Sequence, residues 1–312
     1  MQLLQLKSDE LPRPCVATIG FFDGVHLGHC YLIEQVCEIA DQRNYASAVI
    51  TFPKHPRQII KETLPFKLLT TWEEKLSLLS KTKLDYCIAL DFTKQLAALS
   101  AHDFMLLLRD EFNVRALLIG YDHRFGHNRS DGFENYVQYG KDLGIEVLHM
   151  RAFKTDAGVA VSSSGIRNYI LTDRVSEANE LLGYDYFLEG TVVGGRQLGR
   201  KIGYPTANLQ VDSEDKVIPS DGVYAVLVTV DNRTYQAMLS IGIRPTINNG
   251  TDRTIEAHLF DFNSDIYGKN IKISFVCYVR PEEKFETLDM LIDQLHKDAI
   301  IVKQILSNKE LK

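Results

Sequence analysis

The sequence predicts an N-terminal α/β domain with a parallel sheet, followed by a C-terminal antiparallel β-barrel with a terminal helix. Three observations support this fold class. The chain has 312 residues, which is long for one compact domain and comfortable for two. Short apolar runs alternate with amphipathic runs from residue 14 to about residue 150, whereas alternation at period two follows Tyr186. The change of pattern places the boundary at 183/184, giving domains 1–183 and 184–312.

Five short apolar runs in the first domain are predicted strands, with helical periodicity in the segments between them. They are Val16–Ile19, Ala46–Phe52, Tyr86–Leu90, Leu117–Ile119 and Ile145–His149. Strands that alternate with helices form a parallel sheet covered on both faces, and ligands bind beyond the carboxyl ends of its strands. The layout is Rossmann-like, although neither G-x-G-x-x-G nor a Walker A sequence occurs in this half.

The turn after the first of these strands, Gly20–His29 (GFFDGVHLGH), leads directly into a helical pattern. Its glycines leave room for backbone amides to approach a ligand, and the free amides at a helix start attract phosphate. If the helix starts near His26, the three-residue spacing places His26 and His29 on one face, as N–H donors directed at the same anion. A lone histidine or glycine pair would instead indicate an ordinary connection with surface histidines.

This turn resembles the H-x-G-H motif of nucleotidyltransferases, a motif that by itself leaves several acceptors open. The fuller pattern, Gly-x-Phe-Asp-Gly-x-His-x-Gly-His, resembles the adenylyltransferase half of the bifunctional riboflavin kinase/FAD synthetase family. The resemblance implies catalytic roles for His26 and His29. It also implies nucleotide or substrate binding by Gly20, Phe21, Asp23, Gly24 and Gly28.

Two further loops of the first domain are similar to the same family. In Thr51–Pro56 (TFPKHP), His55 either faces the nucleotide or flavin phosphates or belongs to a purely structural loop. In Gly120–Gly126 (GYDHRFG), Asp122 is suited to holding Mg²⁺ or binding the nucleotide, and Arg124 to contacting phosphate. An Asp–Arg surface pair is the alternative for a loop that stood alone.

The segment Val161–Arg167 (VSSSGIR) precedes another helical pattern and resembles the Ser-Ser-Thr/Ser-x-Ile-Arg signature of H-x-G-H nucleotidyltransferases. Hydroxyls and amides at a helix start bind phosphate oxygens, which implies this role for Ser162, Ser163 and Ser164. Arg167 is expected to follow the negative charge onto departing pyrophosphate. A helix cap alone would explain a serine or two, but it would not demand the arginine.

In the second domain, apolar and polar residues alternate in Val223–Val230, Tyr235–Leu239, Thr254–Leu259 and Ile271–Tyr278. Polar and glycine-containing turns separate these runs, which predicts an antiparallel sheet or small barrel. The last pattern, from Leu288 to Ile305, has helical spacing, so we expect a helix that packs on the barrel.

The stretch Gly190–Leu209 opens the second domain and resembles the riboflavin kinase signature that ends in Pro-Thr-Ala-Asn. Gly194–Gly199 mimics the start of a Walker A sequence, but Arg-Lys replaces Lys-Ser/Thr and the surrounding pattern is β, so a P-loop is rejected. Thr206 offers a hydroxyl and Asn208 an amide oxygen for Mg²⁺. The resemblance assigns substrate or nucleotide binding to Gly195, Gly199, Arg200, Lys201, Gly203 and Pro205.

Three later segments, Ser240–Thr246, Thr254–Phe262 and Arg280–Phe285, are also similar to riboflavin kinases. The resemblance implies that Glu256 is the general base and that Arg244 and Arg280 bind substrate or nucleotide. Without the Pro-Thr-Ala-Asn signature, a solvent-facing strand glutamate would be the simpler interpretation of Glu256.

Together these resemblances imply a bifunctional enzyme that phosphorylates riboflavin in the barrel and adenylylates FMN to FAD in the first domain, with ATP and Mg²⁺ in both steps. Two alternatives keep the flavin but change the activity: a barrel that only regulates the adenylyltransferase, or a flavoprotein sensor. A zinc hydrolase using His26, His29, His123 and His127 lacks H-E-x-x-H and a matching third-ligand spacing.

Composition indicates an ordinary protein of the cytoplasm. A net charge of −6, with 24% charged residues, argues against non-specific nucleic-acid binding, which requires basic patches. The five cysteines are scattered and never spaced as C-x-x-C, which fits a reducing compartment. The sequence has no export signal and no apolar run of about 20 residues, so a membrane is not an expected partner.

Overall fold

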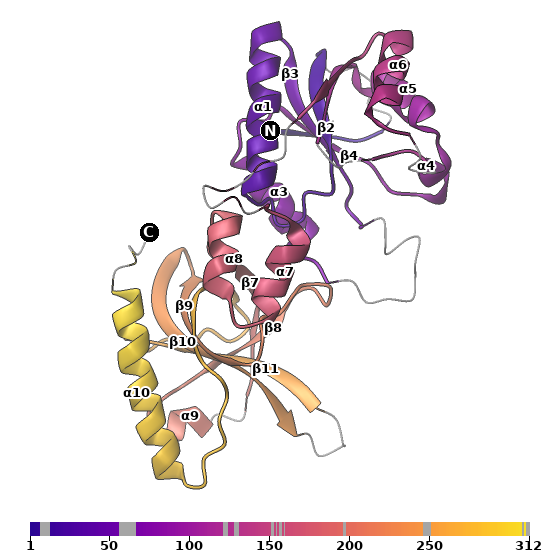
Figure 1. Ribbon diagram of the computed structural model, residues 1–312. Helices are drawn as coiled ribbons and strands as arrows, with labels where there is room; N and C mark the ends of the chain where they lie inside the picture. The colour runs from indigo at the N-terminus through magenta and orange to yellow at the C-terminus, as the bar shows by residue number, and fades with distance from the viewer. Residues whose placement is uncertain are drawn as a thin grey trace. The chain divides into compact units, whose positions relative to one another are not determined.

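The computed structural model divides into two compact units, residues 1–163 and 164–312 (Figure 1). The structure describes residues 1–6, 13–55, 67–120, 124–127, 131–150, 153, 155, 158, 160–195, 198–245, 251–307 and 309. At residues 198, 201, 244, 245, 251 and 252 this description covers the backbone alone.

The first unit is built on a six-stranded sheet in the order β1-β4-β3-β2-β5-β6. The strands are β1 (Gln2–Leu4), β2 (Cys15–Ile19), β3 (Ala46–Thr51), β4 (Tyr86–Ala89), β5 (Val114–Ile119) and β6 (Glu146–His149). Every strand pair is parallel, so the predicted sheet is confirmed. The edge strand β1 was not predicted, because three residues are too few to show a periodic pattern.

Helices cover both faces of this sheet, as predicted. They are α1 (Leu27–Arg43), α3 (Trp72–Ser80), α4 (Lys94–Ala98), α5 (Ala101–Phe112) and α6 (Phe133–Leu143). Ile33 and Val36 of α1 pack on one face, where Leu79 of α3 also lies. Leu108 of α5 and Leu143 of α6 belong to the core on the other face.

Three of these helices end in a left-handed residue that returns the chain to the sheet. Asn44 after α1 has φ 55°, Asn113 after α5 has φ 52°, and Gly144 after α6 has φ 70°. Asparagine and glycine tolerate this conformation, and the next strand begins within two residues in each case. Short, sharply defined connections therefore lead into β3, β5 and β6.

The second unit contains a closed antiparallel barrel in the strand order β10-β11-β8-β7-β12-β9. Its strands are β7 (Phe187–Val193), β8 (Ala207–Val211), β9 (Gly222–Val230), β10 (Arg233–Pro245), β11 (Thr251–Leu259) and β12 (Asn270–Arg280). The predicted barrel is confirmed. A four-residue helix, α9 (Leu198–Lys201), follows β7 in a region that we predicted to be β alone.

The terminal helix α10 (Leu288–Leu306) packs on the barrel, as predicted. Val302 and Leu306 are fully buried against Met238 and Phe260. Asp298, 1% exposed, accepts a bidentate ion pair from Arg280 at the end of β12, with distances of 2.7 to 3.2 Å. The guanidinium thus attaches α10 to the barrel wall.

Helices α7 (Ser163–Leu171) and α8 (Val175–Leu182) precede the barrel; α8 packs against β12, and the Ile170 carbonyl of α7 accepts from the Ser220 amide, just before β9, at 3.3 Å. The Ser176 hydroxyl donates to the Val276 carbonyl at 3.2 Å, and the Asn179 amide donates to the Phe275 carbonyl at 2.8 Å. The compact unit therefore begins near Ser164. The division at 183/184 concerns where each activity resides, and it stays a prediction.

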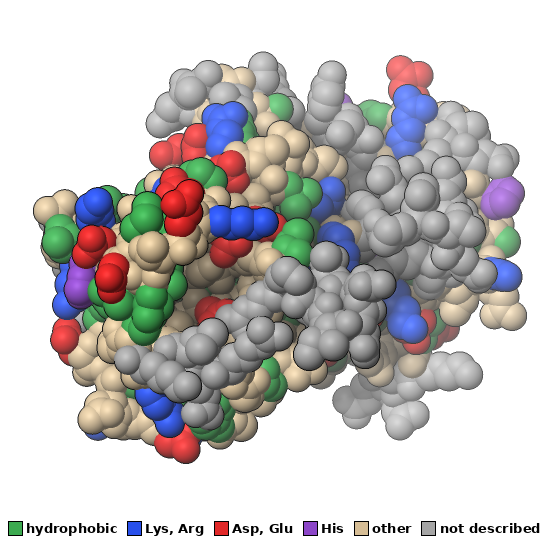
Figure 2. Space-filling model, turned by 90° about the horizontal axis from the view of Figure 1, so that it is seen from below, with side chains coloured by type: hydrophobic (Ala, Val, Ile, Leu, Met, Phe, Trp, Pro, Cys, Tyr) green, Lys and Arg blue, Asp and Glu red, His purple; other side chains and the backbone are tan. Residues whose placement is uncertain are grey.

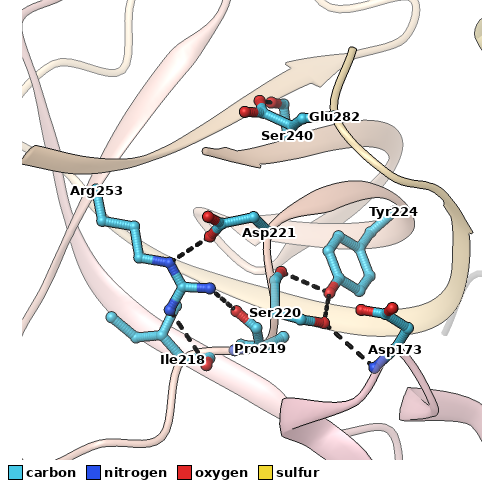
Figure 3. A network of polar contacts seen from close by, with 9 residues as sticks. All are labelled: Asp173, Ile218, Pro219, Ser220, Asp221, Tyr224, Ser240, Arg253 and Glu282. Carbon is cyan, nitrogen blue, oxygen red and sulfur yellow. Dashed lines mark hydrogen bonds and ion pairs between the residues drawn. The ribbon is translucent and has the colours of Figure 1, made fainter. Parts of the chain in front are cut away.

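A polar network supports the segment that enters β9 (Figure 3). The Arg253 guanidinium binds the Asp221 carboxylate and donates to the carbonyls of Ile218 and Pro219. Ser220 lies beside it: its hydroxyl is 2.9 Å from the Tyr224 hydroxyl and accepts from the Asp173 amide at 3.3 Å. The network thus joins β11, the start of β9 and the turn between α7 and α8.

On the face shown in Figure 2, acidic and basic side chains are interspersed, with hydrophobic side chains among them. Within the part of the chain that the structure describes, no helix is both long enough and apolar enough to cross a membrane.

Candidate active sites

The turn after β2 is a tight reversal that two buried apolar side chains anchor. The Gly20 amide extends the sheet by donating to the Ile50 carbonyl at 3.0 Å. Phe22, Gly24 and Val25 then have positive φ angles of 57°, 80° and 39°. Phe22 and Val25 are 1% and 3% exposed, so burial of their side chains offsets the backbone strain.

Helix α1 begins at Leu27, with His26 as its N-cap, which confirms the predicted helix start. Nδ1 of His26 accepts a hydrogen bond from the His29 amide at 3.3 Å. Because that nitrogen is an acceptor, the proton of a neutral His26 ring lies on Nε2. The two imidazoles are stacked, with centroids 3.6 Å apart and planes at 13°. The predicted pair therefore shares one face of the first turn.

Both histidines are held neutral. Burial lowers the pKa of His26 to about 4. Burial, followed by the charges of His26 and Lys75, keeps the pKa of His29 well below its usual value. Nδ1 of His29 is buried and has no hydrogen-bond partner among the described residues. Neutral rings of this kind can donate N–H to a phosphate but do not bring a positive charge to it.

Gly28 is required by the approach of the His26 ring. A Cβ atom at Gly28 would lie 3.3 Å from two atoms of that ring and 3.7 Å from Val161. At Gly20, an added Cβ would meet the Phe22 ring at 3.0 Å. The spacing of glycines and histidines in the motif thus reflects close packing within the turn as well as access to backbone amides.

Asp23 is directed into the protein. Its carboxylate is 3% exposed and accepts from the amides of Leu69 and Thr70 at 2.9 and 3.1 Å. The Thr70 hydroxyl donates to the same carboxylate and accepts from the Gly24 amide at 3.1 Å. These contacts fix the turn on the segment before α3, so they describe a structural role for the Asp23 side chain.

The other predicted residues of the first unit include His55 in the loop after β3 and Arg124 in the segment after β5. The His55 and Phe21 rings meet edge to face at 4.4 Å. Arg124 is exposed, and Asp122 lies outside the described residues. The loop that carries both is held by the buried Tyr136 hydroxyl, which accepts from the Phe125 amide and donates to its carbonyl, each at 3.1 Å.

The triple serine spans the division between the compact units. In the first unit, the Ser163 hydroxyl donates to the Asp23 carbonyl at 3.0 Å, and Ser162 is exposed. In the second, Arg167 donates to the Ser164 hydroxyl at 3.4 Å across the first turn of α7. Ser163 is thereby attached to the H-x-G-H turn, and Ser164 and Arg167 lie close together at the helix start.

The predicted kinase residues converge on one wall of the barrel. The Thr206 hydroxyl donates to Oε2 of Glu256 at 3.1 Å, and the Thr254 hydroxyl lies 3.5 Å from Oε1. Asn208 on β8 is paired directly with Glu256 on β11. A hydroxyl, an amide and a carboxylate thus lie together where two strands meet.

Close packing explains two glycines of the signature. A Cβ atom at Gly195 would overlap the Asn208 amide, and one at Gly199 would overlap the Tyr204 carbonyl. Gly203 has φ 83°, a left-handed turn that leads to Pro205. The side chain of Lys201 lies outside the description.

A pocket of 460 Å³ opens beside Thr206. Its lining includes Arg200, Pro205, Thr206, Leu259, Phe262 and Tyr267. Apolar and aromatic side chains with a few polar groups are typical of a site for a small organic ligand. Thr206 is common to the pocket and to the Thr206–Glu256 pair, whereas the β11 residues of the lining are Ala257 and Leu259, which alternate with Glu256 along the strand.

Two arginines of the predicted kinase site lie at strand ends, Arg280 as the last residue of β12 and Arg244 next to the last residue of β10. Arg280 is bound to Asp298 as described above, and it also donates to the Pro281 carbonyl at 2.8 Å. The side chain of Arg244 lies outside the described residues. Next to Glu256, on the paired strand β10, the Ser240 hydroxyl donates to Glu282 at 2.8 Å.

Sequence reasoning missed two groups of contacts that hold these sites. His258 shares a face of β11 with Glu256, and its Nδ1 lies 2.8 Å from the Pro205 carbonyl. Leu69, Thr70 and Lys75 contact the H-x-G-H turn. A signal for Lys75 was present in the sequence: it occupies the apolar face that Trp72, Leu76 and Leu79 define by helical spacing.

Comparison with known proteins identifies both units. The family model for FAD synthetase matches residues 8–165, and the model for riboflavin kinase matches residues 182–306. A bifunctional riboflavin kinase/FMN adenylyltransferase from Listeria monocytogenes is 37% identical over 284 residues, which is 91% of this chain and 90% of that protein. The chain belongs to this bifunctional family.

The Escherichia coli member of the riboflavin kinase/FMN adenylyltransferase family is 34% identical over 93% of this chain and 92% of its own length. A crystal structure described as a macrolide-efflux protein from Streptococcus pneumoniae has a TM-score of 0.88 and 32% identity, covering 96% of this chain and 98% of that one. As a family member, the protein phosphorylates riboflavin with ATP and adenylylates the resulting FMN to FAD.

The zinc alternative finds no support in the described residues, which include no cluster of three or more His, Cys, Asp or Glu side chains suited to a metal. His123, one of the four histidines considered for it, lies outside the described residues. Oxygen groups, by contrast, are abundant in both sites.

Proposed function

We propose that riboflavin is phosphorylated at the Thr206–Asn208–Glu256 cluster of the barrel and that FMN is adenylylated at the H-x-G-H turn, with functional domains 1–183 and 184–312. The observation that carries the kinase assignment is the 3.1 Å hydrogen bond between Thr206 and Glu256 beside the 460 Å³ pocket. The neutral, stacked pair His26–His29 at the start of α1 supports the second assignment.

In the kinase site, Glu256 is the general base. It accepts the proton of the terminal ribityl hydroxyl as that oxygen attacks the γ-phosphorus of ATP, and ADP leaves. The Thr206 hydroxyl, which donates to Glu256, orients the carboxylate for this task. The adjoining pocket, with Arg200 at its edge, takes one of the two substrates.

The oxygen donors of the kinase site fit Mg²⁺. A hydroxyl whose proton is directed to Glu256 keeps its lone pairs available, and Asn208 offers an amide oxygen from the paired strand. Mg²⁺ prefers oxygen ligands and binds through a few protein groups together with substrate phosphates. Thr206 and Asn208 would hold the ion there, and it would neutralise charge that develops on the transferred phosphoryl group.

In the adenylyltransferase site no strong base is needed, because the attacking FMN phosphate oxygen is already ionised. It attacks the α-phosphorus of ATP, and pyrophosphate leaves. Nε2–H of His26 is available as a donor because Nδ1 is occupied by the helix cap. We assign charge stabilisation to His26, His29 and Arg167, since donors that are already in place stabilise a transition state without reorganisation.

The remaining predicted contacts stand as part of this proposal. In the adenylyltransferase they are Gly20, Phe21, Gly24, Gly28, His55, Asp122, Arg124, Ser162, Ser163 and Ser164. In the kinase they are Gly195, Gly199, Arg200, Lys201, Gly203, Pro205, Arg244 and Arg280. For Asp23 the bonds to Leu69 and Thr70 support a role in shaping the turn.

We also propose that the enzyme works in the cytoplasm without a nucleic-acid or membrane partner. The five cysteines are free thiols, and burial raises the pKa of Cys15 to about 12 and of Cys87 to about 11. Protonated, buried thiols suit a reducing compartment.

Glu256→Gln tests the kinase assignment, because glutamine keeps the size and hydrogen bonding of the side chain but cannot accept the proton. Riboflavin phosphorylation is expected to fall by roughly a hundredfold to ten-thousandfold. Supplied FMN is still converted to FAD at a near-normal rate. The measurement is resolution of FMN from FAD over time after addition of ATP and Mg²⁺.

His29→Ala is the matched variant in the other site, with an expected loss on the order of a hundredfold in FAD formation while FMN accumulates. Equal loss of riboflavin phosphorylation and of adenylylation of supplied FMN in either variant would contradict two separate sites. Normal phosphorylation by Glu256→Gln would remove this residue from the mechanism, and weakened riboflavin binding would make it an orienting contact instead.

A further inference from the structure

The segment before α3, which belongs to none of the motifs, supports the H-x-G-H turn through Leu69 and Thr70. Leu69 and Thr70 bind the Asp23 carboxylate, and the Thr70 hydroxyl accepts from the Gly24 amide. Helix α3 begins immediately afterwards, with a capping box between Thr71 and Glu74. The next residue of α3, Lys75, is thereby held in a fixed position next to the turn.

Lys75 is a buried cation with three hydrogen-bond acceptors. It is 2% exposed. Its ammonium donates to the Phe21 carbonyl at 2.9 Å, to the Phe52 carbonyl at 2.8 Å and to the Thr51 hydroxyl at 3.3 Å. The ammonium also lies 3.9 Å from the centroid of the Phe21 ring. One side chain therefore joins the loop after β2 to the loop after β3.

These two loops carry several of the predicted substrate contacts of the first unit, among them Phe21 and His55. Phe21 belongs to the turn that leads to the histidine pair, and its ring touches His55, three residues beyond Phe52. Thr51 completes the junction by donating its hydroxyl to the Phe21 carbonyl at 3.0 Å. A shift of Lys75 would be transmitted to both loops.

The charged form of Lys75 suits this geometry better than the neutral form. An ammonium has three N–H donors, one for each acceptor, whereas a neutral amine has two. Burial opposes the charge and lowers the pKa of Lys75 to about 7, although Asp23, the next largest influence, favours the charged form. The junction thus loses a donor when the amine deprotonates.

We propose that Lys75 is a positioning residue of the adenylyltransferase. Its ammonium sets the spacing between the loops after β2 and β3, and it places a positive charge next to the Gly20–His29 turn. The substrates are a nucleoside triphosphate and a phosphomonoester, both strongly anionic, so a buried cation close to the turn favours their binding. This inference rests on the proposed assignment of adenylylation to the Gly20–His29 turn.

Lys75→Met tests the inference in the full-length enzyme, with Lys81→Met as the matched control. Methionine has a similar length but neither charge nor donor, and Lys81, the exposed C-cap residue of α3, is six positions away. The expected result for Lys75→Met is a loss on the order of a hundredfold in kcat/KM for FMN adenylylation, because small misplacements of substrate contacts have effects of this size. Riboflavin phosphorylation and the Lys81→Met variant stay normal.

Thermal unfolding separates positioning from simple support of the fold. Methionine removes the cost of burying a charge but leaves the Phe21 and Phe52 carbonyls without this donor, and the unfolding midpoint of the first unit measures the balance of the two effects. A folded variant with lost adenylylation supports the inference. A variant that is folded and fully active overturns it, as does one whose activity loss disappears once its unfolded fraction is corrected for.

The pH profile supplies a second readout. The ratio of kcat/KM for FMN adenylylation between the wild type and Lys75→Met should fall by about tenfold between pH 6 and pH 8.5, as Lys75 deprotonates. His26 and His29 titrate below this range and Cys87 above it, while Asp23 faces the ammonium and Glu74 lies beside it on α3. Taking the ratio of kcat/KM between the two enzymes cancels titration of the FMN phosphate, and a ratio that increases from pH 6 to pH 8.5 overturns the assignment of the effect to the charged amine.

His29→Ala distinguishes failure of this inference from failure of the site assignment. If His29→Ala abolishes FAD formation and Lys75→Met does not reduce it, the turn is the site but Lys75 does not position it. If His29→Ala leaves FAD formation intact, the assignment itself is wrong, and the inference about Lys75 is overturned with it.

Discussion

His26 combines two functions in one ring. Nδ1 caps α1, and this leaves Nε2–H as the group that can face a ligand. Serine, threonine, aspartate and asparagine usually cap helices, so a histidine here supplies a cap and a phosphate donor together. Its burial also links the stability of the first unit to pH.

We expect acid to destabilise the first unit through His26. Its pKa is about 4 in the folded state and near 6.5 when exposed, so the unfolded chain binds more protons between these values. The stabilisation is complete above pH 6.5 and is lost as the pH falls toward 4. By pH 5 the loss is about 2 kcal/mol.

His26→Asn keeps a capping side chain but removes this titration. Urea unfolding of the wild type and the variant at pH 7 and pH 5, followed by the fluorescence of Trp72, measures the difference, because Trp72 is the only tryptophan of the chain and lies in the first unit. The same pH sensitivity in both proteins would assign it to another group.

At the scale of single residues, the sequence predicted the local contacts better than the distant ones. The His26–His29 pair follows from helical spacing, so it could be placed on one face before the fold was known. The bonds of Asp23 to Leu69 and Thr70 were not predicted, because these partners are remote in the sequence. The contacts of Lys75 with Phe21 and Phe52 were missed for the same reason, although its place on the apolar face of α3 was a local signal.

At the scale of elements, periodicity predicted the sheet strands from β2 onward, the barrel and α10. It did not predict β1 or α9, which have three and four residues and are too short for a pattern to develop. The change of pattern after Tyr186 indicated where the β-rich part of the chain begins, but it could not show that α8 packs against the barrel.

We expect a fragment 164–312 to be more stable than a fragment 184–312, although both contain the kinase cluster. Truncation at 184 removes Val175, Ala178 and Leu182, which are at most 1% exposed, together with the bonds from Asn179 to Phe275 and Tyr186. Loss of this burial costs about 4 kcal/mol.

Thermal unfolding and kinase assays on the two fragments measure this difference. Kinase activity in both, with a lower midpoint for the shorter one, is the expected result. Equal midpoints would show that α7 and α8 add nothing to the barrel, and a folded fragment 164–312 without kinase activity would contradict the domain assignment.

At the scale of the whole molecule, each proposed activity has its own set of residues in a different part of the chain. The kinase cluster belongs entirely to the second unit, and the H-x-G-H turn to the first. A protein damaged in one site therefore retains the other, which makes the two activities separable by mutation.

A mixture of Glu256→Gln and His29→Ala proteins is expected to convert riboflavin to FAD, although neither protein does so efficiently alone. FMN made by His29→Ala is released and then adenylylated by Glu256→Gln. FAD formation in the mixture is followed over time and at increasing dilution. Absence of FAD, with FMN adenylylation by Glu256→Gln intact, would mean that FMN does not leave the chain that made it.

The parallel sheet also has a consequence for synthesis of the chain on the ribosome. β1 is made first but pairs with β4, and β2 has neighbours on both sides only once β5, which ends at Ile119, has been made. A nascent chain stalled after residue 100 therefore leaves one edge of β2 open. One stalled after residue 163 contains all six strands of the sheet, before any barrel strand has been translated.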